Sequence, residues 1–221
     1  AEKGAYLSFN SEKDYSQSFE LARKWEESAL TPTSRFDAQL MALRSAYQTN
    51  NSVAVGEYAN KITTSGQASQ EQVATANFYV GKMAYDKGDY ARAYPALQSV
   101  TQKTTTEIMP EAYHLQAQIL YKQRKYAQAA ELIPQANQAS AGYDDWIAKN
   151  LILLSDVYAE QGDKNSATAA LEAVLENYKG NDASILATAR EKYNRLNSNA
   201  PPPTNKGIKG SNFLELEEGG N

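Results

Sequence analysis

Apolar positions along the chain recur every three or four residues, which is the spacing of one face of an α-helix. Residues 78–85, 115–121 and 151–158 each show this spacing, and each segment is followed by a short polar stretch. No convincing run of alternating apolar and polar residues, the pattern typical of a half-buried β-strand, occurs in the chain. The pattern therefore predicts an all-α protein with essentially no sheet.

The short polar stretches return at a nearly constant interval. They fall at positions 50, 88, 124 and 162, so that the intervals are 38, 36 and 38 residues. Gly88 and Gly162 permit the left-handed backbone that ends a helix, and the Asp89 and Asp163 that follow can cap the next helix. A period of this length fits two helices joined by a tight turn. The sequence therefore predicts a stack of helical hairpins.

Composition and turn signals set the limits of the predicted segments. Lys13-Asp14-Tyr15 lies about one period before position 50 and is expected to be the turn of a first, truncated hairpin. Beyond Leu196 the chain contains Pro201-Pro202-Pro203 and many Asn and Gly residues, a composition typical of a flexible tail. We expect, in order, a partial leading hairpin at 1–34, four helical hairpins at 35–181, a capping helix at 182–196 and a flexible tail at 197–221.

Three consecutive hairpins carry small and apolar residues at matching positions. These are Gly81, Gly88, Ala93 and Leu97, then Ala117, Ala129 and Ile133, then Ser155, Gly162, Ala167 and Leu171. The pattern resembles the tetratricopeptide repeat (TPR) family, with Arg124 in place of the turn glycine in the second hairpin. The resemblance implies a right-handed α-α superhelix with a C-terminal capping helix, and a non-catalytic scaffold for protein–protein interaction.

The resemblance also implies a groove lined by the first helix of each hairpin. At one groove position three repeats carry a Tyr, and two of them carry a cation one turn earlier. Such a groove would suit a peptide with acidic and apolar residues. Tyr at these positions is also common as packing between helices, and this alternative stays open. The predicted partner-binding residues are Arg44, Tyr47, Phe78, Lys82, Tyr85, His114, Gln118, Tyr121 and Lys122.

Few residues offer catalytic or cofactor chemistry. The net charge of −4 argues against a nucleic-acid binder, and the single histidine, His114, leaves no His pair for a metal. We interpret Asp144-Asp145 as a helix cap rather than a catalytic carboxylate pair, and Glu26-Glu27 as a solvated helix face. We therefore expect a protein that is not an enzyme and binds no cofactor.

The sequence gives weaker indications about location. The stretch from Asp144 through Asp156-Val157-Tyr158 to Gly162-Asp163 is similar to the C-terminal end of large exported bacterial repeat proteins. That resemblance implies a periplasmic or cell-envelope location, with the cytoplasm as the alternative. The longest apolar run, Leu151 to Leu154, is far too short for a direct membrane span. Because the chain begins at Ala1 with the repeat already under way, we expect a processed protein or an excised fragment.

Residues Phe213 to Glu218 are apolar and acidic, and they are complementary to the predicted groove. We expect that this segment can occupy a groove of its own or of a neighbouring chain, and so support self-association. The alternative is an unstructured tail. Two other functions remain alternatives to the scaffold: a repeat domain that binds a small molecule or glycan, and a structural spacer within a longer chain.

Overall fold

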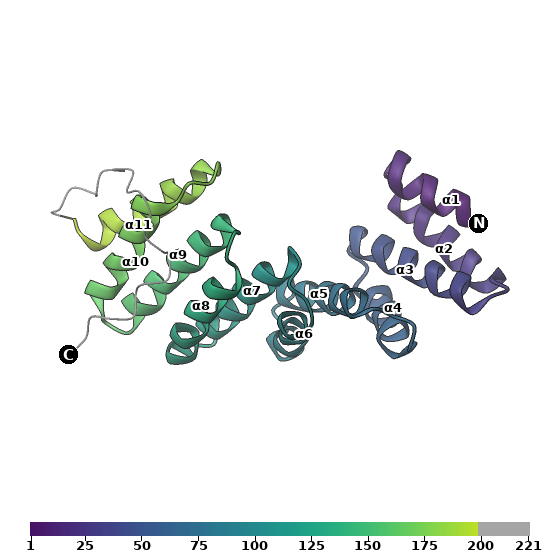
Figure 1. Cartoon of the computed structure of the whole chain (residues 1–221), viewed down its shortest axis with the longest axis horizontal. Coiled ribbons are helices and arrows are strands. Elements are labelled where there is room, and N and C mark those ends of the chain that lie inside the picture. The colour runs from purple at the N-terminus through teal and green to yellow at the C-terminus, as the bar shows by residue number, and fades with distance from the viewer. Residues whose placement is uncertain (199–221) are drawn as a thin grey trace. The chain divides into compact units, whose positions relative to one another are not determined.

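The computed structural model describes residues 1–198, and over this range it is built from helices with no strand. This confirms the predicted all-α class. The chain forms two compact units, residues 1–108 and the part that follows from Met109. Within each unit the helices succeed one another along the chain as short antiparallel neighbours (Figure 1).

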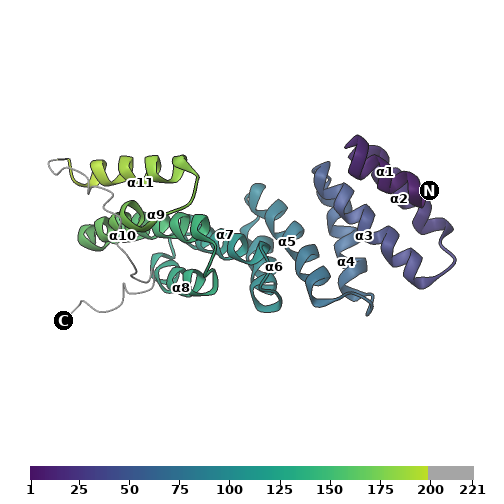
Figure 2. The same ribbon diagram turned by 45° about the horizontal axis from the view of Figure 1, so that its top comes forward.

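In the first unit every helix packs on the next one along the chain, from α1 to α6 (Figure 2). In the second unit α9 packs on both α8 and α10, and α11 covers α10 and part of α9. The helices of the first unit are α1 (Glu2–Leu7), the π-helical segment η1 (Ser8–Glu12), α2 (Tyr15–Ser28), α3 (Pro32–Gln48), α4 (Ser52–Thr64), α5 (Gln70–Asp86) and α6 (Tyr90–Lys103). Those of the second are α7 (Ile108–Lys122), α8 (Tyr126–Ala139), α9 (Asp144–Glu160), α10 (Lys164–Asn177) and α11 (Ala183–Leu196).

This consecutive packing is that of a helical solenoid, and α11 takes the position of the predicted capping helix. The predicted domain limits at 34, 181 and 196 stay predictions. The self-association segment 213–218 and nearly all of the predicted tail lie outside the described residues.

The predicted turns are confirmed by their backbone geometry. One residue in each turn has a left-handed conformation, and the φ values are 57° at Lys13, 55° at Asn50, 75° at Gly88, 58° at Arg124 and 81° at Gly162. The next residue caps the second helix in the predicted manner: the Asp89 carboxylate accepts from the Arg92 amide at 3.1 Å, and that of Asp163 accepts from the Ser166 amide at 3.0 Å. The recurring turn is therefore a left-handed residue followed by a side-chain cap, except at Lys125, which makes no such bond.

The predicted helix cap at Asp144-Asp145 is wrong. The cap position of α9 is Tyr143, whose side chain makes no capping bond, and both aspartates lie inside the first turn. Their negative charge there is favourable because helix N-termini carry partial positive charge. The Asp145 carboxylate also accepts a hydrogen bond from the Tyr178 hydroxyl at 2.6 Å, which joins the start of α9 to the end of α10.

One close contact joins the two helices of hairpin α5–α6, and the residues at the same register of the two later hairpins are buried. In α5–α6 the contact joins Gly81, seven residues before the left-handed turn residue, to Leu97, nine residues after it. A Cβ atom placed on Gly81 would lie only 2.7 Å from the Leu97 Cγ. The same register gives Ala117 with Ile133 in α7–α8 and Ser155 with Leu171 in α9–α10, and all four side chains are buried.

In hairpin α3–α4 the large residue is on the first helix and the small residue is on the second, the reverse of the later hairpins. The first helix carries Leu43 and the second carries Ala59, and both are buried in the core of the first unit. The register thus again carries one large and one small buried residue, although here the small one is on the second helix.

Replacing Gly81 with Ala is expected to lower the free energy of unfolding of the first unit by about 1–3 kcal/mol, because the new methyl group overlaps the Leu97 side chain. Gly56→Ala is the matched control, since its Cβ would meet only the mobile end of Arg92. Because Ala favours a helix more than Gly does, Gly56→Ala is expected to raise the free energy of unfolding by about 0.5–1 kcal/mol. Urea denaturation followed by circular dichroism tests both, and equal effects of the two substitutions would contradict the assigned contact.

Candidate partner-binding site

The first helices of two consecutive hairpins, α3 and α5, enclose a surface cavity of about 250 Å³ in the first unit. Arg44 is exposed at this cavity, and Glu71 lies across from it on α5. The predicted residue Arg44 is thus placed beside a hollow between first helices, where the resemblance locates a groove. The full lining is Leu40, Leu43, Arg44, Ser69, Glu71, Gln72, Thr75 and Tyr79.

Two tyrosines form a stacked pair beside this cavity. The rings of Tyr47 on α3 and Tyr79 on α5 lie 3.9 Å apart between centroids and are nearly parallel, at 7°. Burial raises the pKa of Tyr79, and the positive charge of Arg44 opposes that shift. Sequence reasoning missed Tyr79 because the neighbouring repeats carry Met41 and Leu115 at the equivalent position, so no repeated aromatic marks it.

The other predicted residues of the first unit lie along α5. Phe78 is buried, and the Lys82 Nζ lies 5.6 Å from the centroid of its ring. Tyr85 is half-buried and packs at 5.9 Å against Tyr90 of the same hairpin. Tyr47 and Tyr85 therefore both make ring contacts inside the protein, which keeps the packing alternative open for this row.

In the second unit the predicted residues lie on α7. His114 is buried, and its Nδ1 lies 2.8 Å from the Asn150 Oδ1 of α9. Asn150 in turn donates to Asn137 of α8 at 3.0 Å, and the Gln118 amide nitrogen lies 2.9 Å from the His114 Nε2. The indole of Trp146 packs against the imidazole at 5.5 Å. These contacts form a buried polar chain that joins α7, α8 and α9.

The hydrogen bonds of this chain are satisfied when His114 is neutral. Nδ1–H then donates to Asn150, and the Nε2 lone pair accepts from Gln118. Burial lowers the pKa of His114 below 6.5, with the positive charge of Lys149 acting in the same direction, while the Asn150 hydrogen bond and Glu111 oppose the shift. The neutral ring is therefore the form that the fold stabilises.

The remaining predicted residues of α7 lie toward its C-terminal end. Tyr121 is half-buried, and its ring packs at 5.7 Å against Tyr126, while Lys122 is exposed. The equivalent tyrosines Tyr85 and Tyr121 thus each pack on the first residue of the following helix. Partner contact by His114, Gln118, Tyr121 and Lys122 stays a prediction, as it does for the residues of the first unit.

Acid is expected to destabilise the second unit through His114. Its pKa in the folded protein lies below the ordinary value of 6.5, so the unfolded state takes up the proton first as the pH falls. The resulting loss of stability begins near pH 6.5 and continues until the folded-state pKa is passed. Urea denaturation at the two pH values is expected to show that the free energy of unfolding falls more from pH 7.5 to pH 5.5 in the wild type than in His114→Gln. Because the chain holds one histidine, equal losses would contradict this assignment.

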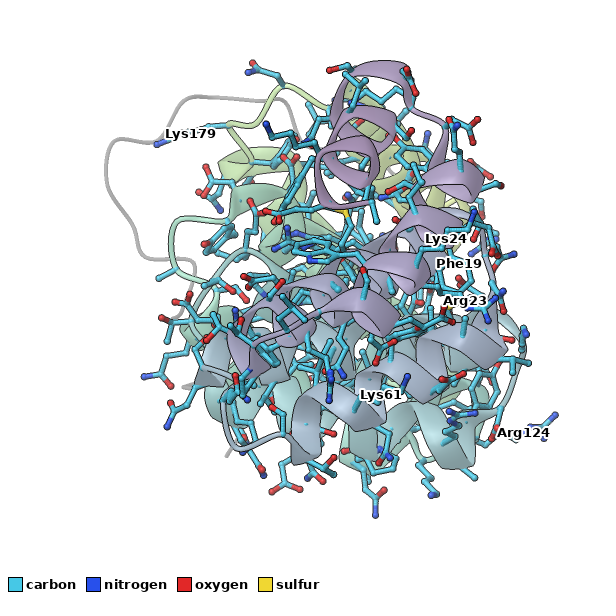
Figure 3. The ribbon with its side chains drawn as sticks, turned by 90° about the vertical axis from the view of Figure 1, so that its right-hand side faces the viewer. Phe19, Arg23, Lys24, Lys61, Arg124 and Lys179 are labelled. Carbon is cyan, nitrogen blue, oxygen red and sulfur yellow. The ribbon has the colours of Figure 1, made fainter. Side chains whose placement is uncertain are left out.

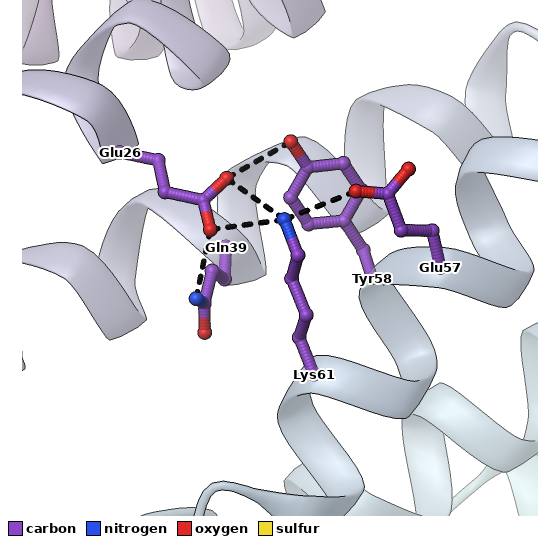
Figure 4. A network of polar contacts seen from close by, with 5 residues as sticks. All are labelled: Glu26, Gln39, Glu57, Tyr58 and Lys61. Carbon is purple, nitrogen blue, oxygen red and sulfur yellow. Dashed lines mark hydrogen bonds and ion pairs between the residues drawn. The ribbon is translucent and has the colours of Figure 1, made fainter.

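A second polar network occupies the first unit and centres on Glu26 of α2 (Figure 4). Its carboxylate accepts from the Gln39 amide at 2.9 Å, from the Tyr58 hydroxyl at 3.0 Å and from the Lys61 ammonium at 3.1 Å. Lys61 also pairs with Glu57 at 3.0 Å. Glu26 comes from the leading hairpin and its three donors come from α3 and α4, so the network joins two hairpins.

The prediction that Glu26 lies on a solvated helix face is wrong, although it holds for the exposed Glu27. Only 16% of the Glu26 side chain is exposed. Burial by itself would raise the pKa of Glu26, but the hydrogen bonds from Gln39, Lys61 and Tyr58 outweigh it, so the pKa lies below 4.5. Burial and the Glu26 charge together raise the pKa of the Tyr58 hydroxyl.

The neighbouring surface of α2 carries exposed cations. Figure 3 shows Phe19, Arg23 and Lys24 on α2 and Lys61 on α4. Phe19 packs edge-on against Tyr58 at 5.9 Å, and Arg23 pairs with Glu20 at 3.5 Å. Phe19 thus contacts one member of the Glu26 network, Tyr58, while Lys24 is exposed and takes no part in the network.

Glu26→Ala is expected to reduce the unfolding free energy of the first unit by about 1.5–3 kcal/mol, because it removes a largely covered carboxylate shared by three donors. Glu27→Ala is the matched control on the next residue, and its effect is expected to stay within about 0.5 kcal/mol. Urea denaturation at neutral pH measures both. Similar values for the two variants would show that the network contributes little.

Within residues 1–198 no helix is long and apolar enough to cross a membrane. The same part of the chain holds no group of three His, Cys, Asp or Glu side chains arranged to bind a metal ion.

The antiparallel helix pairs, the recurring turn and the cavity between first helices define a helical repeat protein. The sequence model of the tetratricopeptide repeat-like domain family matches residues 22–197, and the chain belongs to this family. No curated protein and no solved structure matches it. Its fold is the helical repeat scaffold that is typical of protein-interaction modules.

Proposed function

We propose that the protein is a non-catalytic scaffold that binds a peptide segment of a partner protein on the first-helix face of its hairpins. The observation that supports this most directly is the cavity between α3 and α5. It combines apolar walls from Leu40 and Leu43, the stacked Tyr79 ring and the exposed guanidinium of Arg44. Ordered aromatic rings beside a cation offer both packing area and charge to an extended peptide.

The charge of Arg44 is available to a partner. Within the described residues it forms no ion pair, and it is exposed at the rim of the cavity. A carboxylate on the partner would form a charge-assisted hydrogen bond with it, while an apolar neighbour would pack on Tyr79. The proposed ligand is therefore an acidic and apolar segment. The proposed location is the periplasm or cell envelope.

Affinity capture with the full chain as bait tests the scaffold and its face together. A specific partner is expected to be recovered from a cell-envelope extract by the wild type and by Lys24→Glu, a charge reversal on the exposed outer part of α2. Arg44→Glu is expected to reduce recovery by roughly tenfold, since the reversal replaces attraction by repulsion.

Both baits must keep the helical circular dichroism of the wild type for the comparison to count. If the Arg44→Glu bait recovers as much partner as the wild type, the partner does not bind on the first-helix face. Recovery by no bait, in envelope and cytoplasmic extracts alike, would argue against the scaffold itself.

A further inference from the structure

A second and larger cavity lies at the open end of hairpin α3–α4. Its volume is about 530 Å³, and it shares no lining residue with the cavity between α3 and α5. The loop before α3, the first turns of α3 and the end of α4 form its walls. We call it the end cavity, and its lining is Leu30, Thr31, Pro32, Arg35, Phe36, Gln39, Lys61, Thr64, Ser65 and Gln67.

The next hairpin provides an internal comparison. Hairpin α5–α6 has a similar hollow of about 470 Å³ at its open end, where Ser69 takes the helix-capping position that Thr31 takes in α3. A hollow thus occurs at the open end of both hairpins, where the two helices are farthest from the turn that joins them. The chemistry differs: the apolar and basic residues of the end cavity are replaced 38 positions later by small or neutral ones, whereas Glu71 and Lys103 line the second hollow. The pairs are Leu30 and Ala68, Arg35 and Val73, Phe36 and Ala74, and Lys61 and Ser99.

The end cavity has an apolar wall that is open to solvent. Leu30 is 98% exposed, the largest value among the exposed large apolar residues of the described chain, and it stands beside Pro32 and Phe36. An isolated exposed leucine is ordinary on a protein surface. At the edge of the cavity the exposed Leu30 and Pro32 offer apolar contact to a partner side chain, whereas Phe36 is itself buried.

The charge of the end cavity resides in one residue. Lys61 is already paired with Glu26 and Glu57, so its charge is neutralised inside the protein. Arg35 is exposed, donates weakly to the Ala29 carbonyl at 3.4 Å and forms no ion pair within residues 1–198. No carboxylate lines the cavity. The cavity therefore presents one uncompensated positive charge next to apolar surface.

We propose that the end cavity is a second docking site, which takes a peptide segment of a partner protein carrying an apolar side chain next to a carboxylate. The apolar side chain packs against the exposed Leu30 and Pro32, and the guanidinium of Arg35 donates to the carboxylate. This site is separate from the proposed binding face of the first helices, because the two cavities share no lining residue. Binding at the end cavity therefore does not require binding at the first-helix face. Charge complementarity to a single Arg favours a segment with one carboxylate directly beside the apolar residue.

Peptide binding to the full chain tests this site. The probe is a fluorescent, end-blocked hexapeptide with one carboxylate, Ala-Phe-Leu-Glu-Ser-Ala, and its charge-reversed form, Ala-Phe-Leu-Lys-Ser-Ala, is the control. Fluorescence anisotropy is expected to show saturable binding of the acidic peptide and roughly tenfold weaker binding of the basic one. Arg35→Val and Leu30→Ala, which install the residues of the next hairpin, are each expected to weaken the acidic peptide roughly three- to tenfold.

Lys24→Val is the matched control, because Lys24 is exposed on α2 and lines neither cavity, and it is expected to leave the peptide affinity unchanged. Arg35→Gln serves as a second charge-removing variant if Arg35→Val alters the helical circular dichroism. The end cavity is overturned if the acidic peptide shows no saturable binding, or if both Arg35 variants bind it as the wild type does. Weaker binding by Arg44→Val together with unchanged binding by both Arg35 variants would assign the peptide to the first-helix face instead, and would also overturn this site.

Discussion

The fold depends on one close contact between the two helices of each hairpin. Seven residues before and nine after each turn residue, the hairpins carry one large and one small buried residue, and in α5–α6 these two, Gly81 and Leu97, are in direct contact. Hairpin α3–α4 fills the same space with Leu43 and Ala59, so the sum of the two volumes is constrained more tightly than either identity. Once this contact sets the register, the outward faces of each helix are determined, and with them the positions of Arg44 and Tyr79.

Each unit adds a polar network that ties three helices together. Glu26 joins α2 to α3 and α4, while His114 joins α7 to α9 and, through Asn150, to α8. Apolar contacts between helices tolerate small shifts along the axis, but a buried polar group that loses its partner is costly. Such networks therefore favour one alignment of neighbouring hairpins over alternatives with similar apolar burial.

The sequence was informative where a feature depends on residues close together in the chain. A left-handed residue and the Asp beside it act locally, so the turns at Gly88 and Gly162 could be predicted from two adjacent positions. Glu26 was misread because its donors lie 13, 32 and 35 residues away, and nothing in its own helix reveals them. Tyr79 was missed for a related reason, since its stacking partner lies on another hairpin and its position is not aromatic in the neighbouring repeats.

The availability of charge separates the two proposed surfaces of the first unit. Arg23 and Lys61 are paired with carboxylates, whereas Arg35 and Arg44 form no ion pair within residues 1–198. Both stand on α3, nine residues apart, which is about two and a half helical turns. Their side chains therefore leave opposite sides of one helix, and each lines a different cavity. A single rigid helix thus presents one cation to each surface, so that a substitution at either arginine tests one surface without changing the charge of the other.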